Sequence, residues 1–149
     1  MAVYSGAVRS ITPSLTDDNW AITAGANKSG KILELWCGGE ATTSTAMCTR
    51  HARASGQTGA STSGNTEKMH PNSPAKGFGF VTTFATTQPT LESGDLWVTS
   101  WNAHGGVVRV LFAPGEEPVL IGATTELCIV SRNTVGTATS SYGLCWSED

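Results

Sequence analysis

Charged residues are scarce in this chain. Asp, Glu, Lys and Arg make up 14% of its 149 residues, whereas they make up about 25% of a typical soluble domain. Only 9 residues are Lys or Arg, and the formal net charge is -3. A face that binds nucleic acid needs clustered basic residues to neutralise phosphates, so the composition argues against a nucleic-acid partner. It also predicts a surface that a partner protein partly covers.

Long apolar segments are absent as well. No run approaches the roughly 20 apolar residues that span a bilayer. The first residues, MAVYSGAVRS, lack the charged and then apolar layout of a secretory signal. We therefore expect no membrane partner and synthesis in a cytosol.

Histidine patterns typical of metal sites are missing too. His51, His70 and His104 are isolated from one another, and none belongs to an HxH or HExxH motif. A cupin-type metal site, the obvious enzymatic site of a small β-barrel, needs such a motif. The sequence therefore predicts no metal.

The acidic residues do not form a catalytic pair. Glu116 and Glu117 are adjacent, so on a strand they would point to opposite faces and could not act together on one substrate. Asp17 and Asp18 lack the spacing of a calcium-binding loop. We expect no catalytic residue and no cofactor, and hence a protein that is not an enzyme.

The four cysteines leave two interpretations open. Cys37, Cys48, Cys128 and Cys145 are too far apart for a CxxC pair, and without a secretory signal an even count does not establish a disulfide framework. They are most simply read as small buried hydrophobic residues. However, Cys37 and Cys48 flank a turn-rich segment, and so do Cys128 and Cys145, so each pair could also bond across a hairpin.

What the chain does contain is a series of short segments with the composition of β-strands. Apolar residues alternate with polar ones, or run together with β-branched residues, over residues 2–12, 20–24, 31–37, 46–54, 78–87, 95–101, 126–131 and 141–146. No helix longer than one turn is indicated. These features predict an all-β protein: one domain spanning residues 1–149, folded as an antiparallel β-sandwich, most simply a jelly roll of about eight to ten strands.

Residues 102–121 form the stretch around which we expect the rest of the chain to be organised. Val107 to Phe112 is interrupted only by Arg109, which suits a strand buried on at least one face. The Pro114-Gly115 pair is a turn signal, and a second apolar run begins at Pro118. We expect a central β-hairpin here.

Two segments are candidates for contacts outside the domain. Residues 1–12 read as an extended N-terminal strand or arm, and residues 55–77 are rich in Gly, Ser, Thr, Asn and Pro and read as a long loop. Loops of this length are uncommon in compact domains unless they have a function, such as packing on a neighbouring subunit.

In the strand predicted at 46–54, His51 and Arg53 share one side. We expect this side to be exposed to water or to lie at an interface.

Tryptophan is the residue type best suited to binding. We expect three of Trp20, Trp36, Trp97, Trp101 and Trp146 to fill the core and two to be left for an interface. Exposed indoles also stack on sugars, so the alternative function is a glycan-binding jelly-roll module, with a lectin-like or host-attachment role on a virion.

Three stretches together resemble a known family: NWAITAGANKSGKILELWCGGEATT (19–43), HPNSPA (70–75) with FVTTFATTQPT (80–90), and GGVVRVLFAPGEEPVLI (105–121). The family is that of the small jelly-roll decoration, or cement, proteins of tailed bacteriophages. The resemblance implies a homotrimer on the outer surface of a virion, bound to the major capsid protein, stabilising the head without enzymatic activity.

Contacts within such an assembly are assigned to the two candidate segments. We expect capsid binding through the N-terminal arm, at Val3, Tyr4 and Val8. We expect contacts between subunits through the long loop, at Met69, His70, Pro71 and Asn72.

Overall fold

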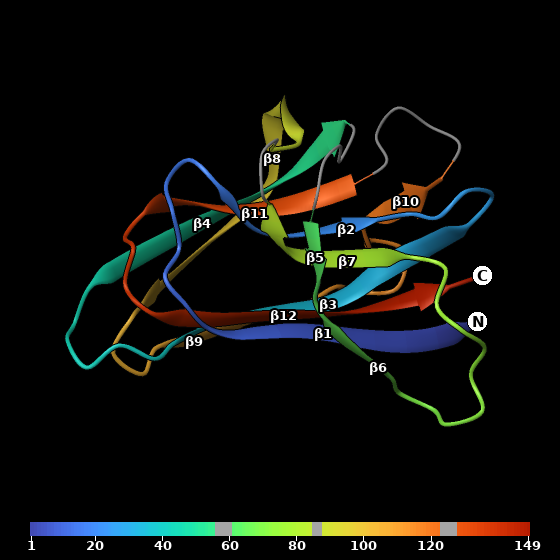
Figure 1. Cartoon of the computed structure of the whole chain (residues 1–149), viewed down its shortest axis with the longest axis horizontal. Coiled ribbons are helices and arrows are strands. Elements are labelled where there is room, and N and C mark those ends of the chain that lie inside the picture. The colour runs from blue at the N-terminus through green and yellow to red at the C-terminus, as the bar shows by residue number, and fades with distance from the viewer. Residues whose placement is uncertain (56–60, 85–87, 123–127) are drawn as a thin grey trace.

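The computed structural model (Figure 1) describes residues 1–55, 61–84, 88–122 and 128–149, and their regular structure consists of twelve strands in two antiparallel sheets. The first sheet contains, from edge to edge, β10 (Val119–Ile121), β3 (Ser29–Gly39), β12 (Ser140–Glu148), β1 (Ala2–Ile11) and β6 (Asn65–Lys68), and β9 (Val107–Leu111) also pairs with β3. The second contains β5 (Ser61–Ser63), β7 (Gly79–Phe84), β2 (Asp18–Thr23), β11 (Cys128–Val135), β4 (Ala46–Ser55) and β8 (Thr90–Asn102).

The two antiparallel sheets packed on each other confirm the predicted β-sandwich. The chain crosses from one sheet to the other at each step from β1 to β4, and it crosses again between β8 and β9, between β10 and β11, and between β11 and β12. The central strands β9/β10, β3, β12 and β1 of the first sheet lie against β8, β4, β11 and β2 of the second, an order that matches the one expected of a jelly roll. The strands number somewhat more than expected because β5, β6 and β7 are inserted between β4 and β8.

Aromatic side chains fill the space between the sheets. On β12 the alternation of the sequence points Tyr142, Leu144 and Trp146 inward, and all three are fully buried. Tyr4 of β1 stacks on Trp146, with ring centroids 5.8 Å apart. Burial of each such side chain contributes about 1.5 to 3 kcal/mol, so the pairing of β1 with β12 places large apolar groups in the core.

The predicted central hairpin is wrong. β9 and β10 do not pair with each other; both pair antiparallel with β3, through Leu111 opposite Glu34 and Val119 opposite Lys31. Two strands antiparallel to the same third strand run in the same direction, whereas the arms of a hairpin run in opposite directions. β9 and β10 thus follow one another along one edge of β3, and Val107 and Leu111 are exposed rather than buried.

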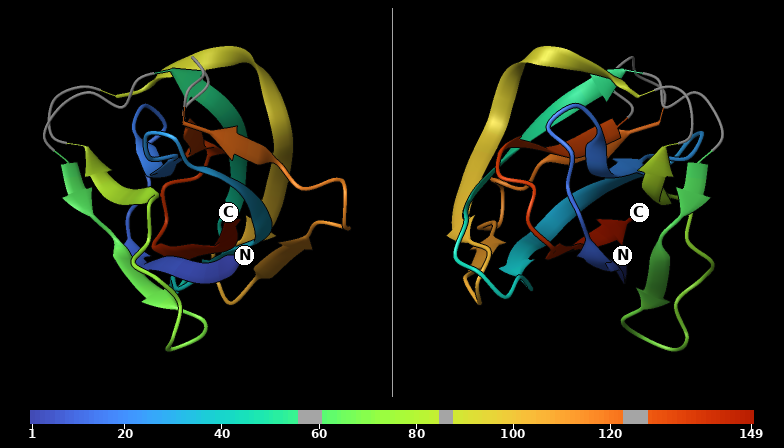
Figure 2. Two further views of the ribbon diagram at one scale, coloured as in Figure 1. Left: turned by 90° about the vertical axis from the view of Figure 1, so that its right-hand side faces the viewer. Right: turned by 60° about the vertical axis from the view of Figure 1, so that its left-hand side comes forward.

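The predicted arm and long loop are both part of the sheets. β1 lies inside the first sheet, hydrogen-bonded to β12 on one side and to β6 on the other, so residues 1–12 are not a separate arm. β5 and β6 fall within residues 55–77 and are joined through Gly64. Because β5 belongs to the second sheet and β6 to the first, this segment crosses from sheet to sheet and covers one side of the sandwich, opposite β9 and β10 (Figure 2).

Candidate interaction surface

Exposed apolar side chains lie on β8, β9 and β10, the strands along one side of the sandwich, and point outward from the two sheets. We call the following set the apolar edge: Leu96, Val98, Val107, Leu111, Val119 and Ile121. Val107 and Leu111 are the most exposed, at 72% and 66%. β8 and β9 are neighbours here although they belong to different sheets, because Trp97 of β8 contacts Phe112, directly after β9, with ring centroids 4.9 Å apart.

The backbone along this side also offers hydrogen-bonding groups. In the part of the chain that the structure describes, β8 pairs only with β4, and β9 and β10 pair only with β3. β8 and β9 therefore each present one row of backbone groups without a strand partner among the described residues, as edge strands do. One acceptor is filled from the opposite sheet, where Arg53 Nη1 donates to the Val119 carbonyl over 3.0 Å. Exposed apolar side chains beside an edge backbone are features of a protein-binding surface.

The tryptophans divide as the sequence predicts. Trp20, Trp101 and Trp146 are buried, at 1%, 8% and 0% exposure, while Trp36 and Trp97 are half-buried. Trp97 is enclosed by His51 and Phe112. Trp36 lies on the outer face of the first sheet and is the tryptophan most open to a ligand.

The residues predicted to bind a capsid are not arranged as an exposed group. The Tyr4 side chain is 1% exposed, and its hydroxyl donates to the Pro74 carbonyl over 3.0 Å. Val3 and Val8 are half-buried within β1. The Tyr4 side chain therefore packs in the core and is not exposed on an arm, and capsid contact through Val3, Tyr4 and Val8 stays a prediction.

The residues predicted to contact a neighbouring subunit do form an exposed turn. Met69 to Asn72 are all exposed, and the turn is closed by a hydrogen bond from Ser73 N to the His70 carbonyl at 3.0 Å. Its start is joined to β1 through Met69 N and the Val3 carbonyl. Contact with another subunit through this turn stays a prediction.

The end of the same loop is anchored by one buried carboxylate. Glu148, 7% exposed, accepts hydrogen bonds from Gly77 N at 2.6 Å, Phe78 N at 3.0 Å and Trp146 Nε1 at 2.9 Å. The last residue of β12 thereby fixes residues 77 and 78 against the sheet. Sequence reasoning missed this contact because the two segments are 70 residues apart.

The disulfide alternative for the cysteines is wrong. Cys37 lies on β3 and Cys48 on β4, in different sheets, and the same is true of Cys128 on β11 and Cys145 on β12, so neither pair faces across a hairpin. All four are free thiols. Burial raises the pKa of Cys37 and of Cys128 to about 12, which keeps both thiols protonated and unreactive. The prediction of small buried hydrophobic residues holds for these two.

His51 lies in the core, contrary to the expectation of a wet or interfacial side. It is fully buried between Trp20 and Trp97, with ring centroids at 5.8 Å and 5.2 Å. His51 faces Ser131 on β11, whose neighbour Asn133 accepts hydrogen bonds from Thr49 at 2.6 Å and Tyr142 at 3.0 Å. These polar side chains of the core are all buried, at 0 to 1% exposure.

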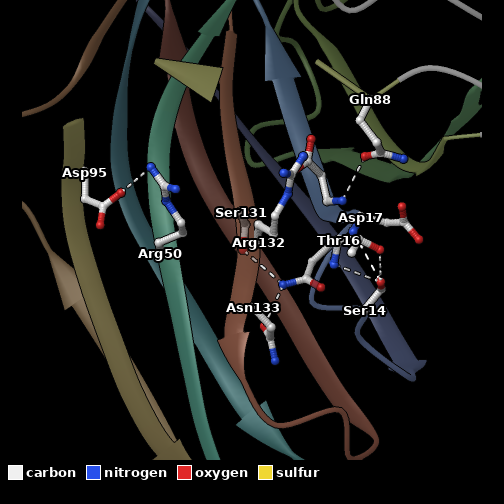
Figure 3. Close-up of polar contacts among 11 residues, drawn as sticks. Ser14, Thr16, Asp17, Arg50, Gln88, Asp95, Ser131, Arg132 and Asn133 are labelled. Atoms are coloured by element: carbon white, nitrogen blue, oxygen red, sulfur yellow. Dashed lines mark hydrogen bonds and ion pairs between the residues drawn. The ribbon is translucent and has the colours of Figure 1, made fainter. Parts of the chain in front are cut away.

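A second polar group lies on the second sheet beside these residues (Figure 3). Asp18 accepts from Arg132 Nε over 2.7 Å, and Arg50 pairs with Asp95 over 2.6 Å. Burial raises the pKa of Asp18 to about 6, although the Arg132 guanidinium opposes the shift. These contacts join β2 to β11 and β4 to β8, so their role is structural. Among the described residues, no group of His, Cys, Asp or Glu is arranged to hold a metal ion.

Comparisons with known proteins do not place the chain in a family. No protein-family model matches it, and no curated protein is similar to it. Within the described residues there is no helix with the length and apolar character to cross a membrane.

Proposed function

We propose that this protein is a structural component of a virion, a decoration or cement protein that binds the outer surface of the major capsid protein as a homotrimer. The observation that carries the proposal is the apolar edge: six exposed Leu, Val and Ile side chains on β8, β9 and β10, along one side of a β-sandwich. The resemblance of the three sequence stretches to phage decoration proteins supports the same conclusion.

The apolar edge is suited to permanent contact with another protein. Burying apolar surface contributes about 25 cal/mol per Å², and the paired charges nearby need no new partner: Lys31 contacts Glu117 at 3.7 Å, and Arg109 is bound to Glu34. Partner contact therefore removes apolar surface from water without exposing or burying an unpaired charge. This is consistent with a chain poor in charge whose surface is partly covered in its assembly.

Threefold assembly would strengthen weak contacts. In a closed trimer each contact to the capsid occurs three times, and after the first contact forms, the others are intramolecular. A trimer that bridges neighbouring capsid subunits adds buried area between them and so resists pressure from inside the head. No catalytic step is required for this role.

The first test is the mass of the purified protein by light scattering, with and without reductant. We expect a mass three times that of the 15.5 kDa chain, unchanged by reductant because the thiols are free. The second is co-sedimentation with phage heads that lack the protein. A monomer at the concentration that saturates the heads would contradict the trimer, and absence of co-sedimentation would contradict the capsid function.

A double substitution tests the apolar edge itself. Leu111→Lys with Ile121→Lys places two charges on residues that are 66% and 46% exposed, so the fold should persist while trimer formation or head binding falls at least tenfold. Leu15→Lys is the matched control, because Leu15 is 50% exposed but precedes β2, away from this edge. Undiminished assembly and head binding of the double variant would remove the apolar edge from the proposal.

A further inference from the structure

Trp36 has an unusual position on the outer face of the first sheet. It lies on β3 opposite Gly143 of β12 and opposite Arg109 of β9. A methyl group placed on Gly143 would overlap Cζ2, Cε2 and Cη2 of the Trp36 indole, three adjacent ring atoms. The six-membered ring therefore lies over the glycine with one face on the sheet and the other toward solvent, which agrees with a half-buried side chain.

The glycine at position 143 is required by the indole of Trp36 and not by the conformation of its own backbone. It is absent from the glycines with positive φ, which are Gly105, Gly115 and Gly136, so its conformation is open to any residue. Glycine inside a strand weakens the sheet and marks a close approach of another group. At position 143 that group is the ring of Trp36.

A fixed polar pair stands beside the ring. Arg109 binds the Glu34 carboxylate through two nitrogens, Nε to Oε1 and Nη2 to Oε2, the latter at 2.9 Å. A bidentate pair holds the guanidinium and carboxylate in one plane, and the Arg109 side chain is 59% exposed. The Arg109–Glu34 pair leaves the Nη1 donors of Arg109 and the outer lone pairs of the Glu34 carboxylate for a ligand. The net charge of the pair is zero.

We infer that this face is a binding site for a neutral glycan, in which a pyranose stacks on Trp36 and its hydroxyls bond to Arg109 and Glu34. An indole face held parallel to the sheet matches the flat C–H face of a β-linked glucose or galactose ring, and aromatic rings contribute such contacts without losing much side-chain freedom. Vicinal hydroxyls both donate and accept, as the Arg109–Glu34 pair requires. An internally neutralised pair gives no advantage to an anionic sugar.

This site adjoins the apolar edge but extends beyond it. Trp36 extends from β3 over β12, whereas Arg109 lies on β9 between Val107 and Leu111. The inference goes beyond the capsid function, because it assigns a ligand to the indole over β12. A protein bound over Val107 and Leu111 would lie against Arg109, so the sugar is titrated into protein without phage heads.

The test is a titration of the intact protein, as purified, with cellotriose, chitotriose and β-1,4-galactobiose. The readout is the indole Nε1–H resonance of Trp36 in the ¹H–¹⁵N NMR spectrum, with intrinsic fluorescence as a second signal. We expect at least one neutral sugar to shift the Trp36 resonance and to leave that of buried Trp146 unchanged. Each sugar is titrated to roughly 10 mM, which is ten times a dissociation constant of about 1 mM. If none of the three sugars shifts the Trp36 resonance at that concentration, the inference is overturned.

Three variants define the site. Trp36→Ala should weaken binding at least tenfold, and Gly143→Ser, which keeps Trp36 but displaces its ring, should weaken it severalfold; Trp97→Phe is the control and should bind like the wild type. Unchanged affinity in Trp36→Ala, or tighter binding of 3′-sialyllactose than of any neutral sugar, would overturn the site or its ligand class. The two proposals fail separately: sugar binding lost with head binding intact overturns this inference alone, and head binding lost with sugar binding intact overturns the capsid function alone.

Discussion

The imidazole of His51 is stacked on the indole of Trp97, with ring centroids 5.2 Å apart and ring planes inclined by 17°. Neither ring nitrogen of His51 has a hydrogen-bond partner among the described residues. Burial without a partner disfavours the charged form and lowers the pKa of His51 to about 3. The core of this protein therefore contains a histidine that must stay neutral.

The pH dependence of stability should show two opposing contributions. His51 has a lowered pKa, so the unfolded chain takes up its proton first, and acidification from pH 6.5 to 5 should cost on the order of 1 to 2 kcal/mol. Asp18 has a raised pKa of about 6, so the folded protein takes up its proton first, and the same change should contribute about 1 kcal/mol. The free energy of unfolding of the wild type, measured by urea titration, should therefore change little over this interval.

Single substitutions separate these two contributions. His51→Phe should make the protein more stable at pH 5 than at pH 6.5, because only the Asp18 contribution remains. Asp18→Asn should make it less stable at pH 5, because only the His51 contribution remains. The same pH slope in both variants would contradict this account.

Loss of the Glu148 carboxylate should destabilise the fold. Glu148→Ala leaves the Gly77 and Phe78 amides and the Trp146 indole without their acceptor, at a cost of about 3 kcal/mol. We expect a lower urea midpoint and faster proteolysis within residues 69–78. Glu67→Ala, on exposed β6, is the control and should change the midpoint little; equal effects would show that Glu148 has no special role.

The thiols should react according to their burial. Cys48 and Cys145 are half-buried, whereas Cys37 and Cys128 are buried and hydrogen-bonded to Thr99 and to the Ala54 carbonyl. A thiol reagent should label the first two in the native protein and all four after unfolding, as measured by mass spectrometry. A melting temperature that falls on addition of reductant would contradict the absence of disulfides.

Removal of residues 1–12 should abolish folding. The deletion takes away β1, its pairing with β12 and β6, and the buried ring of Tyr4. We expect no cooperative thermal transition by circular dichroism. Deletion of Met1 alone, which is 86% exposed, should leave the transition unchanged; a shortened chain that still unfolds cooperatively would mean that these residues are dispensable for the fold.

The sequence predicts those features that depend on local patterns. Alternation at Tyr142, Leu144 and Trp146 identifies a strand and its buried face, and the succession of such strands identifies the sandwich. Pairing is different because it is non-local: the run from Val107 to Phe112 reads as a strand, but nothing in it indicates that its partner is β3. The cysteine pairs were misread for the same reason, since sheet membership is not a local property.

The other mistaken predictions concern polar residues, which the sequence pattern places at the surface or in a loop. His51 suggests a surface because histidine is seldom fully buried, yet its neighbour Trp97 comes 46 residues later and encloses it. β5 and β6 lack apolar residues and form because β7 and β1 supply hydrogen-bonding partners. The sequence predicts how many of the five tryptophans are buried. It does not predict that Trp36 lies over Gly143, because that position depends on the register between β3 and β12.

The crossing segment formed by β5, Gly64 and β6 has a consequence for the mechanical strength of the sandwich. One short stretch of backbone is hydrogen-bonded to both sheets, through β5 to β7 and through β6 to β1. The sheets therefore cannot separate on this side unless one of these two pairings breaks. The insertion between β4 and β8 thus acts as a non-covalent cross-link between the sheets, in a protein whose cysteines form no covalent one.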